Sequence, residues 1–218
     1  MNILAIETAT PMCSVALGVD GAVLARRELT PRGHASRVVP WIGQLLAEAG
    51  LGYADLDRLA VGRGPGGFTS LRIGLGIIQG IALAHDLPVA PVSSLAALAH
   101  AAVPGDGPIL ALIDARMGEV YAGWFDKHSA GLRELAPELV QDPRAIGLKG
   151  ARGGWRLAGS GLAVAGEALR GRLGDAVVAW QPDAWPLAES VLALAADVEA
   201  VPAWRVEPNY LRDRVTQG

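Results

Sequence analysis

The stretch ILAIETATPMCSVALGVDGAVLARREL, residues 3–29, consists of three apolar runs separated by turn residues. The first run ends in the polar cluster ETATP, and the dipeptide Asp20-Gly21 separates the second run from the third. Asp-Gly between two apolar runs is a strong hairpin signal. The stretch therefore predicts strands at 3–6, 13–19 and 22–29 that form an antiparallel meander at the start of a sheet.

The same order of elements returns after the middle of the chain. An apolar run, a short turn and an alternating run follow one another at 109–125 and predict a second hairpin. The loop VPGDGP, residues 103–108, is the expected boundary between the halves. The prediction is an α/β chain with two lobes, an N-terminal lobe at 1–102 and a C-terminal lobe at 103–218.

Helical and further strand patterns fill both halves. Apolar residues recur at helical spacing along 35–49, with Ser36 as the expected cap and Gly50 as the stop. The remaining predicted elements are helices at 69–85, from Ser93 onward, at 162–172 and at 186–197, and strands at 59–61, 87–92 and 155–158. The helix from Ser93 onward is expected to have Ser93 or Ser94 as its cap. The tail, 201–218, contains two prolines and is expected to be mostly extended and to pack back across the lobes.

The composition bounds the class of protein. Of 218 residues, 51% are hydrophobic and 19% charged, and the net charge of −3 shows no basic excess for tight nucleic-acid binding by this chain alone. The one cysteine, Cys13, lies in an alternating run and is expected to be a buried apolar residue. The N-terminus lacks a signal-peptide pattern, and the apolar run at 71–83 is too short to cross a bilayer. We therefore expect a cytoplasmic protein with no membrane partner.

A glycine-rich segment, GRGPGGFTSLRIGLGIIQG (62–80), joins a predicted strand to a predicted helix. Loops of this kind often bind phosphate through backbone N–H groups at the start of the helix. This loop ends in Gly67-Phe68-Thr69-Ser70 and lacks the lysine of a P-loop. It also lacks the spacing and the ribose-binding acid of a dinucleotide fingerprint, so it carries no specific nucleotide signature.

The helix predicted at 69–85 is apolar on almost every side. Its apolar positions form two stripes, Leu71, Leu75, Ile78 and Ala82 on one and Ile73, Ile77 and Ile81 on the other, and its glycines are Gly74, Gly76 and Gly80. Each glycine costs a helix interior about 1 kcal/mol relative to alanine, so a compensating close contact is expected. The contact is either within the chain's own lobe or with another protein, and the pattern leaves both open.

Few polar residues stand where they could carry chemistry. The four histidines show no metal-ligand spacing, and the sequence has no GxSxG nucleophile motif. Glu7 and Asp114 each follow a predicted strand, where the cleft of a two-lobed fold opens. Two roles remain open for them: cleft carboxylates for acid–base or metal chemistry, or acceptors for neighbouring backbone N–H groups.

Several of these segments resemble the TsaB (YeaZ) family. They are ILAIETAT (3–10), CSVAL (13–17), His34 with the helix after it, the 62–80 segment, PVSSLAAL (91–98), IDARMGEVYAG (113–123) and PNYLR (208–212). The portion at 64–76 is the most specific, although Gly67 and Ser70 stand where the family more often has serine and glycine. The match is thin between Trp124 and Pro208.

The resemblance implies an ASKHA (actin-like, Hsp70-like) fold of two lobes, each a mixed sheet flanked by helices. Proteins of this fold hold a nucleotide between two strand turns, which here begin with Glu7-Thr8 and with Asp114. Arg116 and Met117 stand in the second turn where close phosphate approach favours glycine. The resemblance therefore implies a cleft unsuited to ATP and no cofactor, with Glu7, Thr8 and Asp114 as the candidates for any residual nucleotide contact.

The catalytic relative in the same machinery, TsaD, carries a His-x-x-x-His metal pair. At the matching positions this chain has Ser94 and Leu98. A leucine cannot ligate a metal and a serine is a poor ligand. The resemblance therefore implies no metal, no catalytic residue and no enzymatic activity of this chain by itself.

The resemblance also implies a partner interface. In the family, the helices corresponding to 35–49 and 69–85 form a bundle with the same helices of TsaD. The interface residues expected on this basis are His34, Val38, Ile42, Leu45, Leu71, Gly74, Leu75, Gly76, Ile77, Ile78, Gly80 and Ile81. The same faces are expected to pair in a homodimer when the chain is alone.

The function implied is that of a non-catalytic scaffold or activator in the synthesis of threonylcarbamoyladenosine on tRNA. Such a subunit binds a TsaD-like transferase, helps recruit a TsaE-like ATPase, and meets tRNA indirectly through the complex. Two alternatives are a metallopeptidase-like hydrolase and a small-molecule kinase of the ASKHA fold. The missing metal pair argues against the first, and the turn at Arg116 and Met117 argues against the second.

Overall fold

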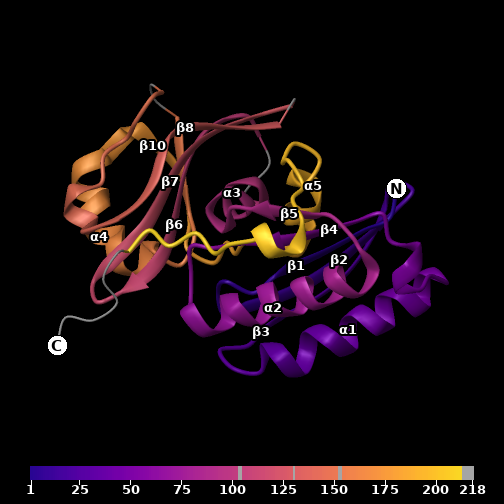
Figure 1. Cartoon of the computed structure of the whole chain (residues 1–218). Helices are drawn as coiled ribbons and strands as arrows, with labels where there is room; N and C mark the ends of the chain where they lie inside the picture. The colour runs from indigo at the N-terminus through magenta and orange to yellow at the C-terminus, as the bar shows by residue number, and fades with distance from the viewer. Residues whose placement is uncertain (103–104, 130, 152–153, 213–218) are drawn as a thin grey trace.

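The computed structural model describes residues 1–102, 105–129, 131–151 and 154–212. It shows two lobes, each built on a five-stranded mixed sheet with flanking helices (Figure 1). The first lobe contains the sheet β3-β2-β1-β4-β5, and the second lobe contains the sheet β10-β9-β6-β7-β8. The α/β fold of two lobes predicted from the sequence is confirmed.

The elements have the following bounds. The strands are β1 (Ile3–Glu7), β2 (Met12–Val19), β3 (Ala22–Leu29), β4 (Arg58–Gly62), β5 (Val89–Val92), β6 (Gly107–Arg116), β7 (Glu119–His128), β8 (Gly131–Gln141), β9 (Trp155–Ala158) and β10 (Val177–Gln181). The α-helices are α1 (His34–Ala49), α2 (Phe68–His85), α3 (Ser94–Ala101), α4 (Leu162–Leu173) and α5 (Ala188–Leu194). Short 3-10 turns lie at η1 (Tyr53–Asp55), η2 (Pro143–Ala145), η3 (Gly174–Ala176) and η4 (Ala203–Arg205).

The two sheets have the same topology. In each sheet the first three strands in sequence form an antiparallel meander, and the next two are added in parallel beside the first. The β2–β3 hairpin turns at Asp20 and Gly21, whose φ angles of 49° and 88° are those that a tight hairpin requires. The strand pattern that restarts near residue 109 therefore marks a structural repeat.

Helices cover both faces of the first sheet. Leu4 and Ile6 of β1 point toward α1 and α2, whereas Ala5 points to the opposite face, toward α3 and α5. Figure 1 shows α1 and α2 below this sheet and α3 and α5 above it. Cys13 is fully buried in the lower core, and burial raises the pKa of its thiol to about 12, so it packs as an apolar side chain as predicted.

The helix α3 connects the cores of the two lobes. Its Ser93 cap accepts hydrogen bonds from the N–H groups of Leu95 and Ala96, both at 3.1 Å, as the sequence predicted for this position. Leu95 and Leu98 are fully buried and pack against residues of β6 and β7 in the second lobe. α3 therefore contributes apolar side chains both to the core of the first lobe and to a core cluster formed with the second lobe.

Some elements differ from the prediction. α1 begins at His34 after Gly33, and Ser36 is not its cap; the Ser36 hydroxyl donates to the carbonyl of Gly33 at 2.8 Å. The strands β8 and β10, the two edges of the second sheet, are additional to those predicted. β8 has no clear alternation, and β10 is the short apolar run VVAWQ, which periodicity alone does not assign to a strand. The predicted loop at 103–108 lies partly outside the described residues, and Gly107 already belongs to β6.

The C-terminal part of the chain returns to the first lobe. α5 packs on the upper face of the first sheet, and Ala188 N donates to the buried hydroxyl of Ser14 in β2 at 2.8 Å. Val201 then pairs with Val89 in an isolated bridge, and η4 lies beside α2. Residues 206–212, which we call the strap, continue from there and contact both lobes. The last residues of the chain, 213–218, lie outside the described part.

Candidate functional site

A cleft of about 710 Å³ lies between the lobes. The first lobe contributes the turn after β1, the start of α1 and the first turn of α2, and the second lobe contributes the β6–β7 turn and the start of α4. The strap residues Asn209 and Arg212 also line it. This is the place where the ASKHA fold is expected to hold a nucleotide, between the turn after β1 and the β6–β7 turn.

Glu7 does not face the cleft. It is fully buried, its Oε1 accepts from Ala9 N at 2.6 Å, and its Oε2 accepts from the hydroxyl of Ser94 at 2.7 Å. Burial raises the pKa of this carboxyl, and hydrogen bonds from Ala9 and Ser94 oppose the rise. Of the two roles considered for Glu7, the structure supports that of an acceptor for the neighbouring backbone.

Thr8 is also buried beneath the cleft. Its hydroxyl donates to the carbonyl of Ser70 at 2.9 Å and so connects the β1 turn to the first turn of α2. The two segments approach so closely that a Cβ at Gly74 would lie 2.3 Å from Thr8 Oγ1. Gly74 is therefore required by the packing of the first lobe itself.

The glycine-rich loop serves the same packing. A Cβ at Gly62 would lie 1.9 Å from Glu7 Oε2, and a Cβ at Gly66 would lie 2.1 Å from the carbonyl oxygen of Ala9. Gly67 N donates to that same oxygen at 2.7 Å. The loop therefore directs its small residues at the chain's own β1 turn, which explains its glycines without a bound phosphate.

The second turn presents side chains to the cleft. Arg116 and Met117 both have left-handed φ angles, 64° and 55°, and Met117 is 73% exposed. Asp114 Oδ1 accepts from Arg116 N at 2.8 Å, and its Oδ2 accepts from the Arg116 guanidinium at 3.2 Å. Asp114 thus lies at the cleft, as predicted, but its oxygens are bound to its own turn.

The two positions that match the metal pair of the catalytic relative are occupied by internal contacts. Ser94 is fully buried, donates to Glu7 and accepts from Gly64 N at 3.2 Å. Leu98 is fully buried in the core between the lobes. Within the described ranges, no group of three or more histidine, cysteine or carboxylate side chains is arranged to hold a metal ion.

The residues expected at the partner interface fall into two groups. Most are buried in the chain's own first lobe: His34, Val38, Ile42, Leu45, Leu71, Gly74, Leu75 and Ile78. These residues hold α1 and α2 against the sheet and are not part of the lobe's exposed surface. His34, for example, places Nε2 3.0 Å from the carbonyl oxygen of Thr10. The remaining four lie at the surface: Gly76 and Gly80 are exposed, and Ile77 and Ile81 are half-buried.

The outer face of α1 and α2 is apolar and lined with small residues. Phe68 and Leu83 of α2 are 48% and 66% exposed, and Val39 of α1 is 51% exposed. A Cβ added at Gly76, at Gly80 or at Gly43 of α1 would meet no atom within 4 Å. This surface, which we call the outer helix face, therefore contains glycines that the packing of the chain itself does not require.

α2 has the length and mean hydropathy of a membrane-crossing helix, with 28% of the segment buried. A single helix of this kind is weak evidence for a membrane span, because core helices pass the same test.

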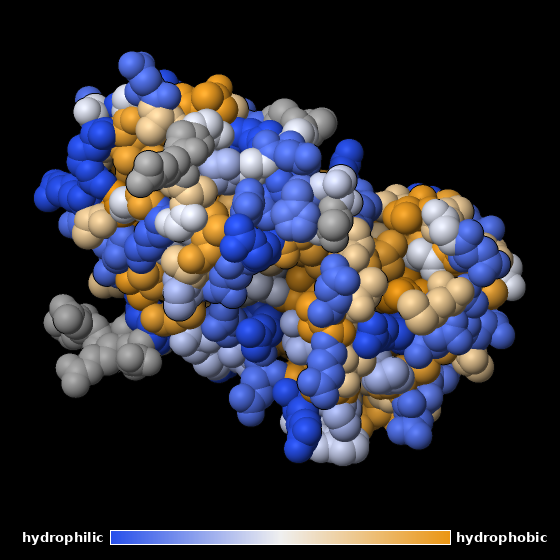
Figure 2. Space-filling model, turned by 90° about the horizontal axis from the view of Figure 1, so that it is seen from above, coloured by the Kyte–Doolittle hydropathy of each residue, from blue (hydrophilic) through white to orange (hydrophobic). Residues whose placement is uncertain are grey.

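Figure 2 shows the side of the molecule away from α1 and α2, where hydrophilic and hydrophobic residues are interspersed over both lobes.

The strap forms one wall of a second groove beside α2. This groove, of about 510 Å³, is lined by Arg72, Gly76 and Gln79 of α2 and by strap residues including Tyr210. Arg72 donates to the Tyr210 hydroxyl at 2.8 and 3.0 Å and lies over the ring of Phe68, 3.6 Å from its centroid. The strap therefore borders both the cleft and the outer helix face, a role that the PNYLR motif alone did not reveal.

Comparison with known proteins places this geometry in a family. The model of the family described as tRNA N6-adenosine threonylcarbamoyltransferase matches residues 26–164. The "tRNA threonylcarbamoyladenosine biosynthesis protein TsaB" of Escherichia coli K12 is 39% identical over 228 aligned positions, which cover 99% of this chain and 96% of that protein. The chain belongs to the TsaB family.

Further relatives agree with this assignment. The TsaB protein of Haemophilus influenzae is 37% identical, over 99% of this chain and 95% of its own length. The solved structure of YeaZ from Pseudomonas aeruginosa superposes with a TM-score of 0.88 at 38% identity, covering 96% of this chain and 99% of that one. The TsaB (YeaZ) resemblance of the sequence motifs is thereby confirmed, over the thinly matched region as well.

Proposed function

We propose that this chain is a non-catalytic scaffold and activator subunit of the machinery that makes threonylcarbamoyladenosine on tRNA. Its TsaB relatives are named as biosynthesis proteins of this modified nucleoside, and the matching family model describes the transferase that completes it. In this role the chain binds a TsaD-like transferase, helps recruit a TsaE-like ATPase and acts in the cytoplasm. tRNA reaches it through the complex.

The site supports a structural role more than a catalytic one. The buried Glu7 and the turn-bound Asp114 are both occupied by internal hydrogen bonds, so neither is available as a general base in this arrangement. Arg116 and Met117 fill the turn in which backbone N–H groups would cradle a phosphate. The chemistry is therefore assigned to the partner.

The observation that carries the proposal is the pair of open glycines on the outer helix face. Gly76 and Gly80 each lower helix stability by about 1 kcal/mol relative to alanine. Among the described residues, no atom lies within 4 Å of where a Cβ would stand at either glycine, so no close contact there compensates for the loss. A helix from another protein could approach the backbone closely at these positions, and the exposed Phe68 and Leu83 would lie at the edge of the contact.

We propose that the same surface also pairs with a second copy of this chain when the partner is absent. A small apolar patch on a two-fold axis can pair with its own copy, and a homodimer would then compete with the heteromeric complex. We therefore propose that the two assemblies exclude each other. Light scattering of the isolated chain, with and without an equimolar TsaD-like protein, would show whether the dimer gives way to a heterodimer.

The experiment that tests the function is nucleoside mass spectrometry of tRNA from cells depleted of this protein. The proposal expects threonylcarbamoyladenosine to disappear and to return when the chain is supplied again. Normal levels of the nucleoside, in cells with an intact TsaD-like gene and no second copy of this one, would overturn it. Co-purification of the tagged chain from the same cells identifies the partners directly.

A further inference from the structure

The strap is attached alternately to the two lobes. Asn209 N donates to the carbonyl of Arg63 in the first lobe at 2.8 Å, and its side-chain amide donates to Glu138 Oε2 in the second lobe at 2.8 Å. The next contacts repeat the alternation, since Tyr210 is held by Arg72 of α2 and Arg212 forms an ion pair with Glu119 of β7. A single extended segment therefore connects the lobes across the mouth of the cleft.

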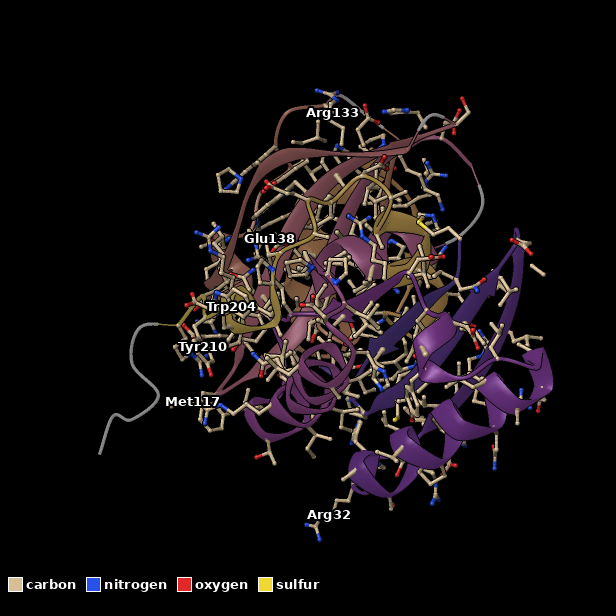
Figure 3. All side chains as sticks on the ribbon, turned by 45° about the vertical axis from the view of Figure 1, so that its right-hand side comes forward. Arg32, Met117, Arg133, Glu138, Trp204 and Tyr210 are labelled. Carbon is tan, nitrogen blue, oxygen red and sulfur yellow. The ribbon has the colours of Figure 1, made fainter. Side chains whose placement is uncertain are left out.

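Glu138 occupies the centre of this connection. Its Oε1 accepts a hydrogen bond from Ser93, which also caps α3, and its Oε2 accepts from Asn209. We call Ser93, Glu138 and Asn209 the clasp. Figure 3 shows Glu138 and Tyr210 toward the same side of the molecule as Met117 of the cleft turn. Three segments that are remote in sequence, the start of α3, β8 and the strap, thus meet at one carboxyl group.

The charged groups around Glu138 are few. Arg63 lies at the end of β4 and attracts the ionised carboxyl, while Glu134 on β8 repels it. Among the described residues no cation lies within ion-pair distance of Glu138, and Arg63 Nε has no hydrogen-bond partner there. The carboxyl is therefore held by two neutral donors, and a proton is the simplest means of neutralising it.

We propose that the clasp is a proton-controlled latch that holds the strap across the two lobes and releases it when Glu138 loses its proton. Release would widen the interlobe cleft and remove one wall of the groove beside α2, because strap residues line both. The latch concerns the chain alone and does not depend on the proposed partner.

The direction of the effect follows from the surroundings of Glu138. Burial raises the pKa of its carboxyl to about 7 from the ordinary 4.5, against the lowering effect of the hydrogen bonds from Ser93 and Asn209 and of the Arg63 charge. The closed clasp therefore binds a proton more tightly than an open one, in which the carboxyl is hydrated. Proton binding favours closure fully below pH 4.5, and this contribution is lost as the pH rises through about 7.

The test is the amide hydrogen exchange of Asn209, measured by NMR on the isolated chain from pH 6 to 8.5 and corrected for intrinsic rates. The Asn209 amide reports on closure because it donates to Arg63. The latch predicts that its protection factor falls about tenfold over this range, by linkage to one proton. In Glu138→Gln, which stays neutral and keeps an acceptor oxygen, the protection factor should be high and constant within about twofold.

Two controls make the result decisive. Glu134→Gln removes the neighbouring carboxylate that helps raise the pKa of Glu138, so the fall in protection should remain and move to lower pH. Asn209→Ala keeps Glu138 but removes the side-chain link from the strap to it, while the backbone N–H at position 209 can still donate to Arg63. Protection of that amide should therefore be low at every pH, which gives a readout even if Glu138→Gln fails to fold. Constant protection in the wild type, an equal fall in Glu138→Gln, or unchanged strap protection in Asn209→Ala would each refute the latch.

Discussion

The two faces of α2 carry glycine in very different surroundings. On the inner face, a Cβ at Gly74 would lie 2.3 Å from the hydroxyl of Thr8. On the outer face, a Cβ at Gly76 or Gly80 would meet nothing within 4 Å. The inner glycine is explained by the fold of this chain. The outer glycines lower helix stability, and no close contact among the described residues compensates for it. A residue that lowers stability without any internal reason points to a contact outside the chain.

The largest expected effect tests the outer face. Gly76→Trp should lower affinity for the TsaD-like partner at least about 100-fold, roughly 3 kcal/mol, because an indole would prevent close approach of the facing helix. Among the described residues, a Cβ at this exposed position meets no atom within 4 Å, so we expect the fold to be kept, and circular dichroism and the melting temperature check this. Isothermal titration calorimetry provides the measurement.

The matched control is Gly171→Trp. Gly171 lies in α4 of the second lobe and, like Gly76, has open space where a Cβ would stand. This variant should bind the partner with unchanged affinity. Equal affinities for both variants would place the interface elsewhere and remove the distinction between the two faces of α2.

A smaller effect is expected on the inner face. Gly74→Ala should lower the free energy of unfolding by about 1–3 kcal/mol, since the added methyl group overpacks the contact with Thr8. Thr8→Ala removes the hydroxyl involved, so the double variant should lose less stability than the sum of the single variants. Urea denaturation of the four proteins measures this coupling, and strict additivity would show that the close approach is not what requires glycine.

A still smaller effect, of opposite sign, is expected on the outer face. Gly76→Ala and Gly80→Ala should each raise the free energy of unfolding of the isolated chain by up to about 1 kcal/mol, through helix propensity alone. The same urea experiment applies, performed at concentrations where the chain is monomeric. If both substitutions destabilise the monomer, the outer glycines have an internal role that the open space around them does not reveal.

The smallest effect concerns the buried carboxyl beneath the cleft. Because burial raises the pKa of Glu7, its protonation stabilises the folded state at low pH, and this contribution is lost as the pH rises through its folded pKa. Glu7→Gln should therefore show a flatter dependence of unfolding free energy on pH above 4.5 than the wild type. Parallel curves for the two proteins would indicate that Glu7 is as free to ionise in the folded chain as in the unfolded one.

Much of the fold could be read from local patterns. The Asp20-Gly21 hairpin and the Ser93 cap depend on residues next to one another in sequence, and both are confirmed. The strands β8 and β10 could not be read in this way, because β8 at the sheet edge alternates weakly and the short apolar run of β10 does not by its periodicity identify a strand. The start of α1 differs from the predicted one, since Gly33 rather than Ser36 precedes its first turn.

For the candidate site, too, the sequence predicts some features and leaves others open. Residue types in the sequence predict which chemistry is disfavoured, because Leu98 cannot ligate a metal, and Arg116 and Met117 have side chains where a phosphate-binding turn favours glycine. Which of the apolar residues of α1 and α2 face inward could not be settled, because both stripes of α2 are equally apolar in sequence. The sheet packs against one stripe and leaves the other partly at the surface.

The sequence thus carries the repeated strand order, the turn chemistry and the family of this chain, all of which depend on residues close together along it. The tertiary structure alone brings Glu7 to Gly62 and Ser94, Thr8 to Gly74, and Glu138 to Ser93 and Asn209. These contacts join segments far apart in sequence, and burial then sets the pKa of each carboxyl. No local pattern reports on these distances or on the burial of these two carboxyl groups, so the roles of these residues emerge only when the chain is folded.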